Sequence, residues 1–294
     1  MSAWLPAAPC TPAACVERTA RAAPAPRAVL RLTAVAALLL AGVALSPLGG
    51  RLPAGLVRRW CRALVRAAGV RARFTGSAVP PAGGLLLVAN HVSWLDVPLL
   101  AAVRPARMLA KTEIRDWPLA GPLAGRGALF IERDRLRALP GTVARIADAL
   151  RGGAAIAAFP EGSTWCGRAQ GRFHRAVFQA ALDAGVPVQP VRIRYRRAGP
   201  GAGEASTAAA FVGDDSLLAS LWRVASARGL LAEVELCPAL PPGTHPDRRT
   251  LAAAAQGRPP EPHPRTAAFG AGHAVGTTPV PPPTATPGAQ GVTV

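Results

Sequence analysis

The sequence predicts an α/β domain with a mixed central sheet covered by helices, preceded by an N-terminal membrane anchor helix. Between residues 76 and 256, short apolar runs bounded by glycine and proline alternate with segments of helical character, which is typical of a sheet with helices on both faces. A longer apolar segment precedes this region. The two ends of the chain lack periodicity, residues 1–27 being rich in alanine and proline and residues 257–294 in proline, glycine, alanine and threonine, so we expect both to be disordered.

We assign the anchor to residues 28–50. Residues 32–48 are almost entirely apolar and reach the lower limit of length for crossing a bilayer. A cleaved secretory signal is the alternative, because Ala44-Leu45-Ser46 resembles a cleavage site, although the 31 residues before the segment are a long lead for a signal. Arginines crowd the C-terminal flank, which by the positive-inside rule predicts a single-pass protein of the cell membrane with its main domain in the cytoplasm.

Residues 51–75 are predicted to form a basic amphipathic helix. Leu56, Trp60 and Leu64 recur every four residues, and arginines occupy the other side. Such a helix can lie in the interface of an anionic membrane. The alternative is a core-packing helix with a solvated basic face.

The composition favours a membrane lipid over a nucleic acid as the anionic partner. The formal net charge is +18 and the pI is about 11.6, which predicts an anionic partner. Aromatic residues make up only 5% of the chain, and the arginines are not interleaved with stacking residues, so we expect no nucleic acid. The five cysteines form no CxxC pair and no metal-ligand spacing with the histidines, so the sequence predicts no metal site and reduced thiols.

His91 and Asp96 are the candidate catalytic pair. The apolar run 84–89 predicts a buried strand, and His91 follows at its carboxyl end, where ligand crevices form in α/β sheets. Pro98 places a helix start near Asp96, so the chain must turn between the two side chains for them to meet. Asp96 would then fix the imidazole tautomer and leave the other ring nitrogen to accept a proton. The alternative is that Ser93 and Asp96 merely form a capping box.

Three further positions follow predicted strands. Lys111 ends the apolar stretch 107–110, Arg133 follows the strand 128–131, and the turn containing Glu161, Gly162 and Ser163 follows the strand 154–158. Each could contact an anionic or polar ligand, and each could instead be solvent-exposed surface. Beyond them we expect a helix over 174–184 ending at Gly185, a strand over 188–195 and an edge strand over 233–236.

Four segments, taken in order, resemble the motif blocks of the glycerolipid acyltransferases, specifically the bacterial 1-acyl-glycerol-3-phosphate acyltransferase family. They begin with Asn90-His91-Val92-Ser93-Trp94-Leu95-Asp96 and continue with residues 127–133, 159–164 and 186–191. The resemblance spans roughly residues 76–191 and implies a glycerolipid acyltransferase-like domain over residues 76–256.

The resemblance implies a mechanism and substrates. His91 would deprotonate the acceptor hydroxyl with Asp96 as its partner, and the hydroxyl would attack the thioester of acyl-CoA or acyl carrier protein, which are co-substrates, so no cofactor is expected. In the family, Arg133 would contact the acceptor phosphate, and Glu161 and Gly162 would help bind the head group. We add Lys111 and Ser163 to the substrate-binding set. The predicted product is phosphatidate, formed from 1-acyl-glycerol-3-phosphate in phospholipid biosynthesis.

The third block departs from the family. Many relatives read Glu-Gly-Thr-Arg-Ser, whereas this chain has Glu161-Gly162-Ser163-Thr164-Trp165 and lacks the arginine. Loss of a positive charge beside a phosphate would suit a zwitterionic acceptor, so acylation of a lyso-ornithine lipid or another lyso-aminolipid is the first alternative. A catalytically idle membrane lipid-binding protein is an alternative from another class, and a thioester hydrolase is a third.

Overall fold

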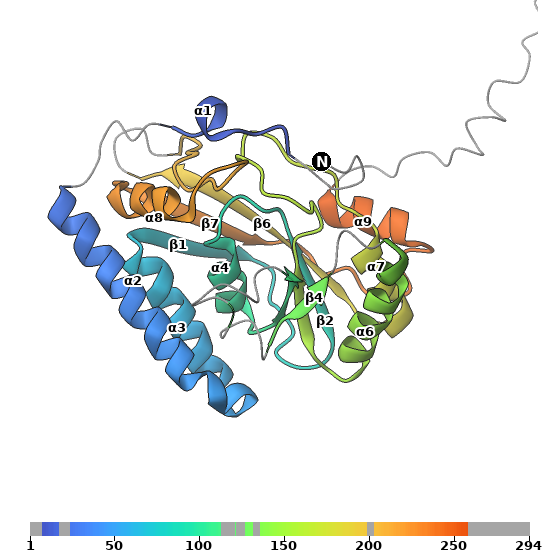
Figure 1. The fold of residues 1–294 in the computed structure, drawn as a ribbon. Helices are drawn as coiled ribbons and strands as arrows, with labels where there is room; N and C mark the ends of the chain where they lie inside the picture. The colour runs from blue at the N-terminus through green and yellow to red at the C-terminus, as the bar shows by residue number, and fades with distance from the viewer. Residues whose placement is uncertain are drawn as a thin grey trace, which may run out of the picture. The chain divides into compact units, whose positions relative to one another are not determined.

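The computed structural model describes residues 8–17, 24–112, 121, 127–131, 136–198 and 203–257. The strands of these residues form one seven-stranded sheet in the order β1-β7-β6-β2-β5-β3-β4 (Figure 1). Neighbouring strands are parallel except for the antiparallel pair β6 and β7, so the predicted mixed α/β fold is confirmed. In chain order, the strands are β1 (Val70–Gly76), β2 (Leu85–Ala89), β3 (Arg107–Lys111), β4 (Leu129–Ile131), β5 (Ala155–Ala158), β6 (Val188–Arg197) and β7 (Leu230–Leu236).

Helices cover both faces of the sheet, and β2 at its centre shows why. Leu85, Leu87 and Ala89 belong to one buried cluster, whereas Leu86 and Val88 belong to the other. Successive side chains of a strand point to opposite faces, so an uninterrupted apolar run fits a strand that is buried on both sides. One cluster draws on α2 (Ala25–Leu45), α3 (Ala54–Ala67), α4 (Asp96–Val103) and α8 (Leu217–Ser226), and the other on α6 (Leu139–Arg151), α7 (Ala176–Ala184) and α9 (Arg248–Gln256).

At the edge of the sheet formed by β1, the structure differs from two of the predicted elements. The predicted basic helix ends at Ala67, and residues 70–76 form β1 instead. Gly69, at φ +87°, turns the chain out of the helix. Beyond it, Arg71 and Arg73 alternate with apolar residues at the two-residue period of a strand. Because β1 pairs with the outer side of β7, β7 is an internal strand and not the predicted edge.

The N-terminal segment also differs from the prediction, since residues 8–17 have a defined course where disorder was expected. They include the short helix α1 (Pro12–Cys15). The Glu17 carboxylate pairs with Arg197 at 2.7 Å, and the Glu17 N–H donates to the Thr207 hydroxyl at 3.0 Å. These contacts fasten the segment to the domain. Nearly all of the predicted disordered tail, residues 258–294, lies outside the described residues.

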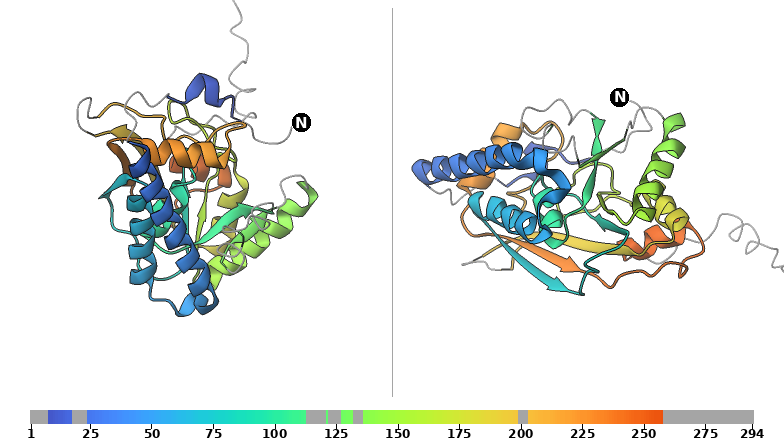
Figure 2. Two further views of the ribbon diagram at one scale, coloured as in Figure 1. Left: turned by 60° about the vertical axis from the view of Figure 1, so that its left-hand side comes forward. Right: turned by 90° about the horizontal axis from the view of Figure 1, so that it is seen from below.

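One described helical stretch, Ala25–Gly49, is long and apolar enough to cross a membrane, with a mean hydropathy of 2.3. It consists of α2 and the short helix η1 (Ser46–Arg51). α2 lies beside α3 (Figure 2), and the Trp60 indole N–H donates to the Leu38 carbonyl at 3.1 Å. Arg31 donates to the carbonyls of Ala225 at 2.6 Å and Ala227 at 2.9 Å, next to the end of α8. Both halves of α2 are therefore bonded to the domain, through Arg31 and Leu38. Large apolar side chains along the helix, such as Leu30, Leu40 and Leu45, are nevertheless exposed.

Candidate active site

The predicted meeting of His91 and Asp96 is confirmed. β2 delivers His91 at its carboxyl end, and a tight turn closed by the Asp96 N–H and the Ser93 carbonyl at 3.0 Å leads into α4. The turn brings His91 Nδ1 to 2.9 Å from Asp96 Oδ2. The Asp96 side chain is fully buried and that of His91 is 20% exposed. A buried carboxylate thus supports an imidazole that can still reach a substrate.

Asp96 is held by three donors besides His91. Its Oδ2 accepts from the backbone N–H of Val92 at 2.6 Å and of Ser93 at 2.8 Å. Its Oδ1 accepts from the hydroxyl of Tyr195 at 2.6 Å. The bond from the Ser93 N–H is one half of the capping box weighed from the sequence, so the local and the catalytic interpretations of Asp96 coexist.

This arrangement decides the tautomer of His91. An ionised carboxylate only accepts hydrogen bonds, so Nδ1 carries the hydrogen and Nε2 presents a lone pair. Nε2 is therefore the atom that can accept a proton from a hydroxyl.

Tyr195 is a site residue that the sequence reasoning missed. It lies on β6, next to β2, and burial together with the Asp96 charge raises its pKa well above 10, so it stays a hydroxyl donor. It is the only tyrosine in the chain, and it falls within a run predicted as a strand. These two facts could have marked Tyr195 as a candidate, but its contact with Asp96 joins residues 99 positions apart in the sequence, which no local pattern predicts.

Residues of the third motif block, 159–164, and Trp165 directly after it bond to the main chain of His91. Its N–H donates to Glu161 Oε2 at 2.6 Å, and its carbonyl accepts from the Trp165 N–H at 2.8 Å. The imidazole also stacks on Phe159, with ring centroids 3.9 Å apart and planes 11° from parallel. The residues that follow β5 therefore fix the position and the plane of the His91 ring.

Glu161 is buried, with 2% of its surface exposed, which excludes the solvent-exposed turn considered from the sequence. Its second oxygen, Oε1, accepts from the Gly171 N–H at 2.9 Å. Burial raises the pKa of Glu161 to about 7; the two backbone N–H groups oppose this effect, and the charge of Asp96 adds to it. Because both oxygens accept backbone hydrogen bonds, the geometry points to a positioning role, and the head-group contact expected for Glu161 stays a prediction.

The structure places the other predicted substrate-binding residues only in part. Gly162 has φ +76°, which the turn after β5 requires. The Ser163 hydroxyl is buried and finds no hydrogen-bond partner among the described residues, so it is available to a ligand. Lys111 ends β3, opposite Ile131. Arg133 lies outside the described residues.

Comparisons with known proteins show which family the chain resembles. Residues 71–194 match the family model described as Acyltransferase. A lyso-ornithine lipid O-acyltransferase from Pseudomonas aeruginosa is 40% identical over 222 residues, which cover 74% of this chain and 80% of that protein. A 1-acyl-sn-glycerol-3-phosphate acyltransferase from Neisseria gonorrhoeae is 36% identical over 153 residues, which cover 52% of this chain and 58% of that protein. The crystal structure of the 1-acyl-sn-glycerophosphate acyltransferase from Thermotoga maritima shares the fold, with a TM-score of 0.54 at 18% identity over 77% of this chain and 93% of that one.

Proposed function

The chain belongs to the bacterial 1-acyl-glycerol-3-phosphate acyltransferase family and is an acyltransferase, and from this premise we propose that His91 is the general base that activates a lyso-lipid hydroxyl. The observation that carries the proposal is the hydrogen bond from His91 to the buried Asp96, which leaves Nε2 free on a partly exposed ring. Removing the proton makes the hydroxyl oxygen a nucleophile without a serine or cysteine intermediate.

The proposed reaction is a direct transfer. Nε2 accepts the hydroxyl proton while the oxygen attacks the carbonyl carbon of a thioester on acyl-CoA or acyl carrier protein. The C–S bond then breaks, and the thiolate takes the proton back from the imidazolium. The Asp96 carboxylate stabilises the imidazolium between these two steps. The products are an ester and a free thiol, and His91 is regenerated.

Two observations favour a lyso-ornithine lipid as the acceptor. The relative with that name aligns over a larger share of both chains than the relative named for 1-acyl-sn-glycerol-3-phosphate. The segment Ser163-Thr164-Trp165 also lacks the arginine that would add positive charge for a phosphate. Ornithine carries an ammonium and a carboxylate, so its lipids need less positive charge at the site. Synthesis of phosphatidate is the second candidate, supported by the 36% identity with the Neisseria protein.

The test compares acyl transfer by membranes that carry the parent protein, His91→Ala or the control His245→Ala, a histidine on the loop after β7. Each is offered lyso-ornithine lipid and 1-acyl-glycerol-3-phosphate separately, with labelled acyl-CoA or acyl carrier protein as donor. We expect ornithine lipid from the parent and the control but not from His91→Ala. Phosphatidate alone would establish the second candidate. Thioester loss without an acceptor would indicate a hydrolase, and no turnover at all would favour an idle lipid-binding protein.

For the membrane, we propose that α2 anchors the protein with the catalytic domain in the cytoplasm, where acyl-CoA and acyl carrier protein are found. The sequence predicts a full span. The bonds of Arg31 to the end of α8 and of Trp60 to the Leu38 carbonyl instead favour a helix that stays against the domain and enters only the membrane surface with its exposed side chains, among them Leu30, Leu40 and Leu45. A full span would need about 20 helical residues to cross a core of about 30 Å. Protease digestion of intact cells and of inverted vesicles distinguishes the two, because only a full span leaves residues before Ala25 accessible from outside.

A further inference from the structure

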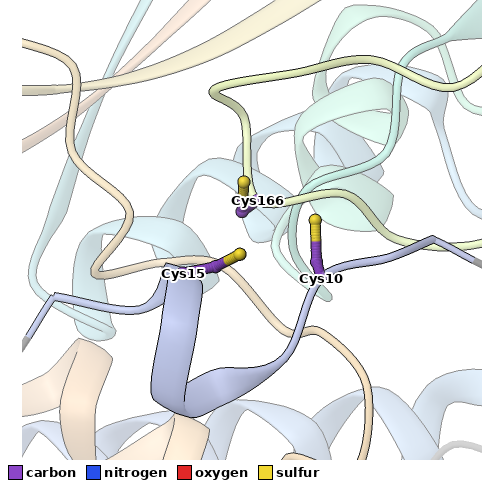
Figure 3. A group of neighbouring side chains, drawn as sticks. All are labelled: Cys10, Cys15 and Cys166. Atoms are coloured by element: carbon purple, nitrogen blue, oxygen red, sulfur yellow. The ribbon is translucent and has the colours of Figure 1, made fainter.

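Three of the five cysteines come together in the fold. Cys10 precedes the short helix α1, Cys15 is its last residue, and Cys166 lies on the segment that follows β5 (Figure 3). Their sulfur atoms all lie within 4.8 Å of one another. Cys10 and Cys166 are buried, and Cys15 is partly buried. Sequence spacing predicts no such group, because Cys166 lies 151 residues after Cys15 in the chain and only the fold brings them together.

Residues 8–17 meet the domain through the side chain of Glu17, which pairs with Arg197, and through Cys10 and Cys15, which lie beside Cys166. α1 has only four residues, which is too short to be stable by its own hydrogen bonds. Glu17 holds the C-terminal end of the segment through Arg197 and Thr207. Cys10 lies toward the other end of the segment, Cys15 lies two residues before Glu17, and both pack in the apolar cluster that contains Val92. A bond through the sulfur atoms would therefore also fix the end at Cys10, which Glu17 does not hold.

The number and spacing of the sulfur atoms favour a metal ion over a disulfide. A disulfide joins two thiols and would leave the third unpaired, whereas a thiophilic ion uses all three. With bonds of about 2.3 Å to zinc, neighbouring sulfur ligands lie roughly 3.8 Å apart, which the observed group can reach by small side-chain rotations.

We propose that Cys10, Cys15 and Cys166 bind one thiophilic metal ion, of which Zn²⁺ is the first to test, and that the ion ties the N-terminal segment to the active-site loop. Cys166 directly follows Trp165, whose N–H holds the His91 carbonyl at 2.8 Å. The ion would thus brace the segment that positions the imidazole. Soft thiolate ligands select Zn²⁺ and Cu⁺ over Mg²⁺ or Ca²⁺.

The test uses the full-length protein, purified without chelator, with zinc measured by mass spectrometry after dialysis and with Co²⁺ loaded into the metal-free form. We expect about one zinc per chain and a thiolate-to-cobalt charge-transfer band in the near ultraviolet. Both should be lost in Cys166→Ser and Cys15→Ser and kept in the control Cys237→Ser, whose cysteine lies outside the cluster. Loading with Zn²⁺ should raise the melting temperature of the parent but not of Cys15→Ser.

Folding of each variant is checked by circular dichroism, and Cys15→Ser is the informative variant if Cys166→Ser does not fold, because Cys15 is the least buried of the three. Metal content equal in Cys15→Ser and parent would overturn the proposal, as would a parent that binds neither Zn²⁺ nor Co²⁺ under reducing conditions. A disulfide between two of these cysteines in protein from the cytoplasm would also overturn it. None of these readouts depends on acyl transfer, so the proposal can fail while the proposed function stands.

Discussion

The variant Asp96→Asn tests how the tautomer of His91 is fixed. The oxygen at the Oδ2 position accepts from His91 Nδ1 and from the backbone N–H of Val92 and Ser93. Backbone N–H groups cannot accept, so an asparagine must place its carbonyl oxygen there. Its amide nitrogen then meets the Tyr195 hydroxyl, which can rotate to accept. His91 therefore keeps its acceptor and its tautomer, and the variant loses only the negative charge.

The loss of charge sets the size of the effect. Two unit charges about 4 Å apart attract by about 4 kcal/mol at an effective dielectric constant near 20, which is an upper limit for the stabilisation of the imidazolium by Asp96. A neutral hydrogen bond in place of a charge-assisted one lowers the stabilisation by about 1 kcal/mol, which is the lower limit. Because about 1.4 kcal/mol corresponds to a factor of ten in rate, kcat should fall between about 5-fold and about 1,000-fold.

The assay measures kcat of parent, Asp96→Asn, Asp96→Ala and His91→Ala with the acceptor that the parent uses. Asp96→Ala removes the acceptor for Nδ1 as well as the charge, so it should approach His91→Ala, for which loss of the base predicts a drop of up to about 10⁴-fold. Asp96→Asn should stay at least about tenfold faster than Asp96→Ala. Equal rates for these two Asp96 variants, with both folded, would refute the claim that backbone donors orient the side chain.

Three further outcomes are expected. Tyr195→Phe removes a charge-assisted hydrogen bond to the buried Asp96, so the free energy of unfolding should drop by about 2 kcal/mol, measured by urea denaturation. Burial raises the pKa of Glu161 from 4.5 to about 7, so between these pH values the native state binds a proton that the unfolded state does not. The free energy of unfolding should therefore fall as pH rises through this window, by about 3 kcal/mol at most. Glu161→Gln should flatten the dependence of the urea midpoint on pH. Ser163→Ala removes an unpaired buried hydroxyl, so KM for the acceptor should rise several-fold without loss of stability, and an unchanged KM would exclude the contact.

The elements that the sequence predicts well are those whose cause is local. The run 84–89 is apolar at every position beyond its first glycine, and only a strand covered on both faces accommodates this. Pro98 fixes the start of α4, and the turn before it leaves His91 and Asp96 within one short loop, so their contact follows from residues close together in the chain. Gly185 ends α7 in the left-handed conformation that glycine favours.

The elements that the sequence does not predict depend on distant partners. Residues 70–75 extend the arginine-rich run of the preceding helix, so they are predicted to belong to it; the alternation after Gly69 fits a strand, and pairing with β7 and the ion pair between Arg73 and Glu233 fix it there. The segment 8–17 has the composition of a disordered tail and gains its course from contacts with Arg197 and Thr207. Tyr195 and the cysteine cluster are similar cases, since no local pattern specifies which distant side chain a hydroxyl or a thiol will meet.

The third block illustrates how one segment can serve the chemistry and vary with the acceptor. Glu161 accepts from the N–H groups of His91 and Gly171, so its carboxylate fixes both the base and the far end of the loop. Trp165 contributes to the same support through its main-chain N–H, which any residue other than proline supplies. The side chains of Ser163 and Thr164 can therefore change without moving the imidazole. In the proposed mechanism, the absent arginine thus bears on which lyso-lipid is bound, whereas the proton transfer relies on His91, on Asp96 and on the support that Glu161 gives to the main chain of His91.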